Sequence, residues 1–230
     1  MLGAFGLVTP AEILFGRGHI AQLNDRATKL GTRALVVHGR NPGRLSGVIE
    51  PFLSSRSNLF TDMLCQEAIP KGLQALKQLM DRESEEARDS LAQVSLFGGL
   101  ALANSGLGVV HGIAGPLGGL CGAPHGAICG ALLPAGIAAN RDNVVEVEHI
   151  ARIDRVIDWI AEVFETSRGQ ALHRFRQWII QNGLPGLASI GVTEEHIISA
   201  SQAAASSSSM KANPVVLSTA SIENVMRYSL

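Results

Sequence analysis

Two histidines in a stretch without charged residues are the clearest candidates for chemistry. His111 and His125 lie fourteen residues apart, on either side of a break at Gly122-Ala123-Pro124. The sequence predicts one apolar helix that carries His111 and a second helix that begins near His125. Two antiparallel helices with a short loop can point both imidazoles at one place, and imidazole binds zinc and iron. The spacing fits a metal pair. From the spacing alone, two core histidines bonded to backbone carbonyls are the favoured interpretation, because a catalytic metal usually takes three protein ligands.

Cysteines close to His125 offer further ligands. Cys121, His125 and Cys129 recur at intervals of four residues, which would place them on one face of a continuous helix. Pro124 interrupts such a helix, so we expect only His125 and Cys129 to pair. A cysteine in this setting is more often a small buried apolar residue than a ligand. A Cys/His zinc site stays open as the alternative.

Outside this segment the candidates are weaker. Gly16-Arg17-Gly18 lacks the third glycine of a G-x-G-x-x-G turn. Gly39, Arg40 and Asn41 follow a predicted buried strand, where α/β sheets bind ligands, and an arginine there could meet a cofactor phosphate. An isolated turn is the plainer interpretation of these three residues. Asp62 and His149 are distant metal-ligand candidates without support from spacing.

The elements that would position these residues change along the chain. Residues 1–58 predict one β-α-β-α unit, with strands at 12–15 and 33–38 and helices over 19–30 and 45–53. Two strands share little sheet and leave their edges open, which suggests missing sequence. From residue 61 to 230 we expect a mostly all-α domain. Its predicted helices span 62–80 with an interruption at Pro70, 84–104, 107–119, 125–139, 144–165, 169–182, 194–208 and 219–228.

Composition excludes several classes of protein. The 230 residues carry a net charge of −1, and only 17% are charged, which gives no electrostatic footprint for nucleic acid. No basic run suits an anionic membrane surface. Three cysteines argue against a disulfide framework, and the first residues do not read as a signal peptide, so we expect a cytoplasmic protein with reduced thiols.

One long stretch without Asp, Glu, Lys or Arg runs from residue 90 to 140. A membrane hairpin is one interpretation of it. The stretch is rich in Gly and Ala rather than Leu, Ile and Phe, and it contains three prolines, so its insertion into a bilayer would be weak. Helices that are apolar on every face also form the core of larger proteins, and this second interpretation is favoured.

Residues 102–134, LANSGLGVVHGIAGPLGGLCGAPHGAICGALLP, resemble the metal-binding segment of the iron-type (group III) metal-dependent alcohol dehydrogenases, which include maleylacetate reductase-like enzymes. Residues 61–76, 183–197 and 210–226 resemble the flanking family motifs. The resemblance implies a dehydroquinate synthase-like architecture: an α/β domain that binds NAD or NADP, a helical domain that holds iron or zinc, and an alcohol, aldehyde or ketone substrate in the cleft between them. Two of the family's histidine ligands map onto His111 and His125.

The departures from the family pattern also have implications. The family's Asp and His ligands just upstream of Thr61 are missing, as is its G-G-G-S phosphate turn, which implies an internal deletion between about Leu53 and Thr61. Gly115 stands where many relatives have a histidine. We therefore expect weak metal binding and weak cofactor binding, unless Asp62, Cys129 or a partner chain supplies ligands. The alternative to an impaired dehydrogenase is an inactive helical scaffold. Core surface exposed by lost strands would favour homo-oligomers.

Overall fold

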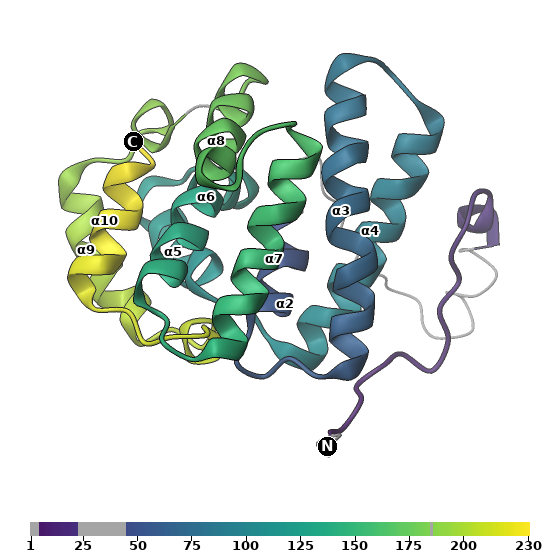
Figure 1. Cartoon of the computed structure of the whole chain (residues 1–230), viewed down its shortest axis with the longest axis horizontal. Helices are drawn as coiled ribbons and strands as arrows, with labels where there is room; N and C mark the ends of the chain where they lie inside the picture. Colours follow the sequence, from purple (N-terminus) through teal and green to yellow (C-terminus); the bar gives the residue numbers. More distant parts are fainter. Residues whose placement is uncertain (1–4, 23–44, 185) are drawn as a thin grey trace.

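A computed structural model of the chain describes residues 5–22, 45–184 and 186–230, and these ranges contain helices but no strand. Helices α3 and α4 form a hairpin on one side, α5, α6, α9 and α10 lie on the other, and α2 and α7 lie between them (Figure 1). The α-helices are α2 (Ser46–Leu53), α3 (Leu59–Asp81), α4 (Glu85–Ser105), α5 (Val109–Cys121), α6 (His125–Asn143), α7 (Val147–Val163), α8 (Ala171–Gln181), α9 (Glu194–Ala205) and α10 (Thr219–Tyr228). Short 3-10 turns are η1 (His19–Gln22), η3 (Arg168–Gln170), η4 (Leu187–Ile190) and η5 (Met210–Ala212).

The expected helical domain is confirmed, and its helix ends fall within a few residues of the predicted ones. Side-chain caps explain several starts. The Asn58 carboxamide oxygen accepts hydrogen bonds from the backbone N–H groups of Phe60 and Thr61, at 3.1 and 3.2 Å, and so fixes the start of α3. Ser84, Thr193 and Ser218 cap α4, α9 and α10 in the same way. Helix α3 continues through Pro70, where we had expected an interruption.

The expected α/β unit is not observed in the described residues. Glu12–Phe15, predicted as a strand, forms none, because no neighbouring strand pairs with it in the described ranges. Of the predicted helix over 19–30 the structure describes only η1, and the second strand at 33–38 lies outside the described residues. Helix α2, which we had assigned to this unit, packs instead against α3, α4 and α7. Helix α2 is therefore part of the helical body.

The N-terminal segment runs beside α4 (Figure 1). The Asn104 side chain accepts a hydrogen bond from the Val8 N–H at 2.6 Å and donates one to the Val8 carbonyl oxygen at 2.9 Å. Further along, the Arg17 guanidinium contacts Asp89 at 2.9 Å and Glu85 at 2.7 Å. The Gly16-Arg17-Gly18 turn thus meets carboxylates on α4, and Arg17 is an ion-pair partner in this fold.

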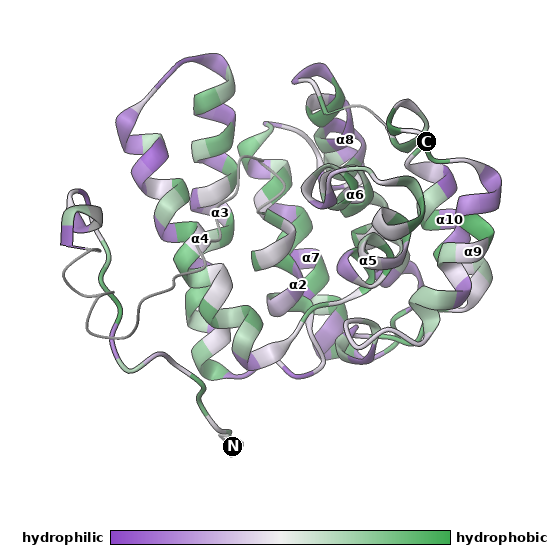
Figure 2. Ribbon diagram, turned by 180° about the vertical axis from the view of Figure 1, so that it is seen from behind, coloured by the Kyte–Doolittle hydropathy of each residue, from purple (hydrophilic) through white to green (hydrophobic). Residues whose placement is uncertain are grey.

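Apolar side chains from all the long helices meet in one core. Hydrophilic residues gather at the outer end of the α3–α4 hairpin, around the loop that joins the two helices (Figure 2). The largest fully buried side chains include Ile49, Ile69, Leu73, Ile113, Leu117, Ile128, Leu132, Ile153, Ile160 and Phe175. Among the described residues, no single helix is long and apolar enough to cross a membrane. Helices α4 and α5 reach that length and apolarity only as a pair, with a bend of 97° between them.

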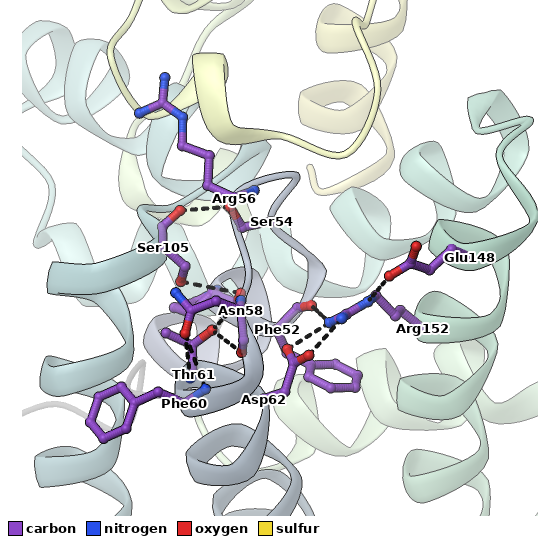
Figure 3. A network of polar contacts seen from close by, with 11 residues as sticks. Phe52, Ser54, Arg56, Asn58, Phe60, Thr61, Asp62, Ser105, Glu148 and Arg152 are labelled. Atoms are coloured by element: carbon purple, nitrogen blue, oxygen red, sulfur yellow. Dashed lines mark hydrogen bonds and ion pairs between the residues drawn. The ribbon is translucent and has the colours of Figure 1, made fainter. Parts of the chain in front are cut away.

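The link between α2 and α3 is held by a polar network (Figure 3). The Ser54 hydroxyl donates to the Ser105 carbonyl oxygen at 2.6 Å, which ties the link to the end of α4. The Arg152 guanidinium, from α7, donates to both carboxylate oxygens of Asp62 at 2.7 and 2.6 Å and to the Phe52 carbonyl oxygen at 3.0 Å. Helix α2 is therefore fixed at its C-terminal end by contacts to both α4 and α7.

Candidate metal centre

The helical hairpin of α5 and α6 brings the two predicted histidines together. Their ring centroids are 5.4 Å apart. The turn between the helices is made by Gly122, which ends α5 in the left-handed conformation with φ of 68°. Pro124 then directly precedes α6, so His125 occupies its first position. His111 is partly buried on the first turn of α5, and His125 is exposed at the start of α6, directly after the turn between the two helices.

Cys129 completes a group of three potential ligands with the two histidines. One ligand atom from each side chain lies within 4.8 Å of the others. The Cys129 sulfur is 3.5 Å from Nε2 of His125, one helical turn earlier on α6. Cys129 is 1% exposed, whereas Cys121 is partly exposed at the end of α5 and is not part of the group. The expectation that His125 pairs with Cys129 rather than with Cys121 agrees with this arrangement.

A buried carboxylate holds His111 in place. Glu50, on α2, is 4% exposed. Its Oε2 contacts Nδ1 of His111 and also accepts a hydrogen bond from the His111 backbone N–H at 3.3 Å. Its Oε1 accepts a hydrogen bond from the backbone N–H of Val110 at 2.6 Å. Glu50 thus orients the imidazole by one side-chain contact and two backbone contacts.

The same carboxylate closes the N-terminus of α5. The first N–H groups of a helix lack partners inside the helix and usually need a capping side chain. Gly108 precedes α5 and has no side chain, so two distant residues supply the acceptors. Asn213 Oδ1 accepts from the Val109 N–H at 3.0 Å, and Glu50 accepts from the next two N–H groups. A carboxylate at this end also interacts favourably with the helix dipole.

The residue Glu50 was missed by reasoning from the sequence. The available signal was its position: it is the one charged residue in SGVIEPFL, a helix whose other residues are mostly apolar and buried. A fully buried glutamate is rare unless its carboxylate is paired with another polar or charged group. The resemblance to the family implied that the segment with a carboxylate ligand just upstream of Thr61 is missing. The structure shows that a carboxylate from that part of the chain does reach the site.

The electrostatics of the pair distinguish the two imidazoles. Burial lowers the pKa of His111, but its hydrogen bonds to Cys129 and Glu50 and the charge of Glu50 outweigh burial and raise the pKa to about 10. Burial and the nearby charge of His111 lower the pKa of His125. His125 is therefore the neutral imidazole, with a nitrogen lone pair available to a metal. At His111 a metal would compete with a proton, so metal uptake is favoured as pH rises.

The residues present fit a divalent transition metal. Because Glu50 contacts Nδ1 of His111, the Nε2 atom of that ring is left for an ion, which is the usual carboxylate–histidine–metal arrangement. Two imidazoles and a sulfur are a donor set that zinc and related ions accept. His111 and His125 are the imidazoles that would hold the ion, and the Cys129 sulfur lies beside them.

The other predicted ligands lie elsewhere. Asp62 is bound to Arg152 and is not available to the site, so its role as a substitute ligand is not supported. His149 lies on α7 outside the ligand group, and its Nδ1 is buried without a hydrogen-bond partner. The candidate cofactor residues Gly39, Arg40 and Asn41 lie outside the described residues.

Substitution of Gly108 tests how closely α2, α5 and the Asn213 loop meet. An added Cβ at Gly108 would lie 2.7 Å from Asn213 Oδ1 and 3.0 Å from Glu50 Oε1, so Gly108→Ala displaces both acceptors of the α5 cap. We expect the free energy of unfolding in urea to fall by about 1–3 kcal/mol. Gly119→Ala is the matched control on the same helix, because nothing lies within 4 Å of its added Cβ. That variant should gain about 0.5–1 kcal/mol. Equal effects of the two substitutions would contradict the packing described.

Comparison with known proteins agrees with this architecture. The C-terminal model of the Fe-containing alcohol dehydrogenase family matches residues 44–230. Alcohol dehydrogenase 4 of Schizosaccharomyces pombe is 30% identical over 178 residues, which cover 76% of this chain and 41% of that protein. The 1,3-propanediol dehydrogenase of Klebsiella pneumoniae is 34% identical over 113 residues, covering 49% and 29%. The chain thus spans about half or less of the length of these relatives.

Solved structures of alcohol dehydrogenases also resemble this chain over most of its length. A crystal structure of 1,3-propanediol oxidoreductase superposes with a TM-score of 0.71 at 26% identity, over 84% of this chain and 53% of that one. An alcohol dehydrogenase from Oenococcus oeni superposes with a TM-score of 0.67 at 24% identity and supports the fold.

The family match begins at residue 44 and includes α2 and its link to α3. It therefore gives no support to a break between Leu53 and Thr61, and it agrees with a helical body that starts at α2. The matched region contains His111, His125 and the carboxylate of Glu50. The chain belongs to the Fe-containing alcohol dehydrogenase family, and its residues 44–230 correspond to the family's C-terminal helical region.

Proposed function

We propose that this chain is the metal-binding helical part of an oxidoreductase that interconverts alcohols with aldehydes or ketones. The observation that carries the proposal is that the imidazole rings of His111 on α5 and His125 on α6 lie close together, with His111 held by Glu50. Relatives such as 1,3-propanediol dehydrogenase and 4-hydroxybutyrate dehydrogenase support a small hydroxylated substrate.

The roles of the residues follow from their contacts. When bound, an iron or zinc ion supplies Lewis acidity to an alcohol or carbonyl oxygen, and NAD or NADP supplies the hydride chemistry. His111 and His125 would hold the ion, and Glu50 keeps the His111 ring in one tautomer and one orientation. His125 is exposed, so a substrate oxygen can approach from its side of the hairpin.

The cofactor side of the proposal concerns the residues that precede α2, which we assign to a partial nucleotide-binding α/β unit with Gly39, Arg40 and Asn41 as its cofactor-binding residues. The sequence contains no G-G-G-S turn to grip a pyrophosphate. Backbone N–H groups of such a turn supply much of the affinity for the phosphates. We therefore propose that cofactor binding and dehydrogenase activity of this chain by itself are impaired.

A second candidate function is a catalytically inactive helical scaffold. It is favoured by one observation: helices α2 to α10 form a core of their own, with side chains such as Ile49, Leu117 and Ile160 fully buried and no sheet in the described residues to complete it. We place either form in the cytoplasm, because all three cysteines are free thiols. Self-association into a homo-oligomer is part of this second proposal.

Metal content per chain separates these proposals. Because Cys129 lies with the two histidines, we expect about one zinc or iron per chain after anaerobic purification without an affinity tag, in place of the weak binding expected from the sequence. His125→Ala should lose the metal, while His173→Ala, which removes an exposed histidine on α8, should keep it. Absence of metal from the wild-type chain, with none taken up on titration, would overturn the metal centre. In the metal-loaded chain, alcohol-dependent reduction of NAD or NADP at an ordinary enzyme rate would overturn the proposed impairment, whereas a chain that takes up no metal supports the scaffold.

A further inference from the structure

We propose that Cys129 is the third protein ligand of the metal and that this ligand set selects zinc over ferrous iron. This inference rests on the proposed metal centre at His111 and His125. It adds a thiolate that neither the helical fold nor the histidine pair by itself requires, and it names the class of ion that the site takes.

The geometry of α6 supplies the first argument. Cys129 follows His125 by one helical turn, so both side chains leave the same face of α6. Their ligand atoms are 3.5 Å apart. Two ligands of a tetrahedral zinc ion, with bonds of about 2.0 Å to nitrogen and about 2.3 Å to sulfur, are separated by roughly 3.5 Å. The observed separation of the sulfur and Nε2 already matches that of two ligands on one ion.

The third ligand atom lies within the same small volume. No two of the three ligand atoms are more than 4.8 Å apart. Glu50 fixes the His111 ring, and the exposed His125 ring at the start of α6 contacts the Ala114 backbone and the Cys129 sulfur. All three side chains are thus held close to one another by contacts within the fold. Three protein ligands with one open position are the usual composition of a catalytic zinc site.

The surroundings of the sulfur supply the second argument. Cys129 is 1% exposed, and its sulfur contacts both His111 and His125, so the buried sulfur already faces two imidazoles. A divalent ion between the sulfur and the two imidazoles would replace these contacts, and the thiol proton and one proton of the His111 ring pass to solvent on binding. Thiolate ligands favour zinc and cobalt, while carboxylate and water favour harder ions. The other two cysteines provide controls, because Cys65 is buried on α3 and Cys121 lies outside the group.

Titration of the metal-free full chain with Co²⁺ tests the assignment. We expect wild type and Cys121→Ser to develop the near-ultraviolet absorption of sulfur-to-cobalt charge transfer with one ion per chain. Cys129→Ser should lack this absorption and bind Co²⁺ at least about 10-fold more weakly. Co²⁺ bound by wild type without the sulfur band would overturn the role of Cys129 and leave the histidine site standing. No binding by wild type would overturn both proposals.

Competition between Zn²⁺ and Fe²⁺ under anaerobic conditions tests the selectivity. Zinc binds more tightly than ferrous iron at most protein sites, so the informative quantity is the change in the zinc-to-iron ratio on substitution. We expect that ratio to fall in Cys129→Ser and to stay unchanged in Cys121→Ser. An unchanged ratio in Cys129→Ser would contradict the proposal. If Cys129→Ser does not fold, X-ray absorption on the zinc-loaded wild type decides directly whether sulfur is bound to the metal.

Discussion

Replacement of Glu50 by alanine should destabilise the protein by about 3–5 kcal/mol, measured as the free energy of unfolding in urea. The carboxylate is 4% exposed and accepts hydrogen bonds from two backbone N–H groups of α5 and contacts the His111 ring. Its removal leaves those N–H groups buried without acceptors at the end of a helix where negative charge is favoured. The His111 ring also loses the contact that fixes its orientation.

Two further variants show whether this loss has the cause described. Glu50→Gln keeps the shape and one acceptor oxygen, so its cost should lie between those of wild type and Glu50→Ala. Glu195→Ala removes an exposed carboxylate from the first turn of α9 and should change stability by no more than about 0.5 kcal/mol. Metal affinity of Glu50→Gln should fall by about 10–100-fold, as expected for a residue that orients a ligand. A fully stable Glu50→Ala would mean that water replaces the carboxylate at the α5 terminus.

Replacement of Asp62 by alanine should cost about 3–5 kcal/mol as well, for a different reason. Arg152 and Asp62 have side chains that are 17% and 16% exposed, and their two-point contact holds α7 against the start of α3. Without Asp62 the guanidinium stays mostly buried with the Phe52 carbonyl oxygen and a longer contact to Glu148. The substitution therefore leaves a buried charge without its main partner.

The double variant Asp62→Leu/Arg152→Met distinguishes two costs: that of leaving Arg152 buried without its carboxylate, and that of losing the whole ion pair. Because it removes both charges, it should recover much of the stability that Asp62→Ala loses. Asp158→Ala provides the exposed comparison, since its pair with Arg168 has side chains 45% and 56% exposed, and we expect about 1 kcal/mol or less. Equal costs for Asp62→Ala and Asp158→Ala, in urea unfolding, would show that burial does not decide the value of these pairs.

The parts of the fold that follow from local chemistry were accessible from the sequence. Helical periodicity and the Gly122–Pro124 break predict the helices and place His111 and His125 on neighbouring ones. The pairing of His125 with Cys129 follows from their spacing of one helical turn. These inferences need only residues that are close in the chain.

The parts that depend on distant residues were not accessible. Glu50 and His111 are 61 residues apart, and no local pattern connects them. From the sequence alone, Asp62 was a candidate metal ligand, because nothing near it in the chain indicated that Arg152, 90 residues later, binds its carboxylate. The strand expected at 12–15 failed for a related reason, since a strand forms only with a neighbour to pair with. An apolar run indicates a strand only when the rest of the sheet is present.

The closure of α5 has a consequence for how the protein is made. Its first turn is completed by Glu50, 60 residues before Val110, and by Asn213, 104 residues after Val109. During translation the ribosome therefore releases the whole of α5 and α6 long before the loop that carries Asn213. The histidine hairpin can form early, but its capped end must wait until Asn213 has been made, so the nascent protein acquires its ordered site only after α9 has also been synthesised.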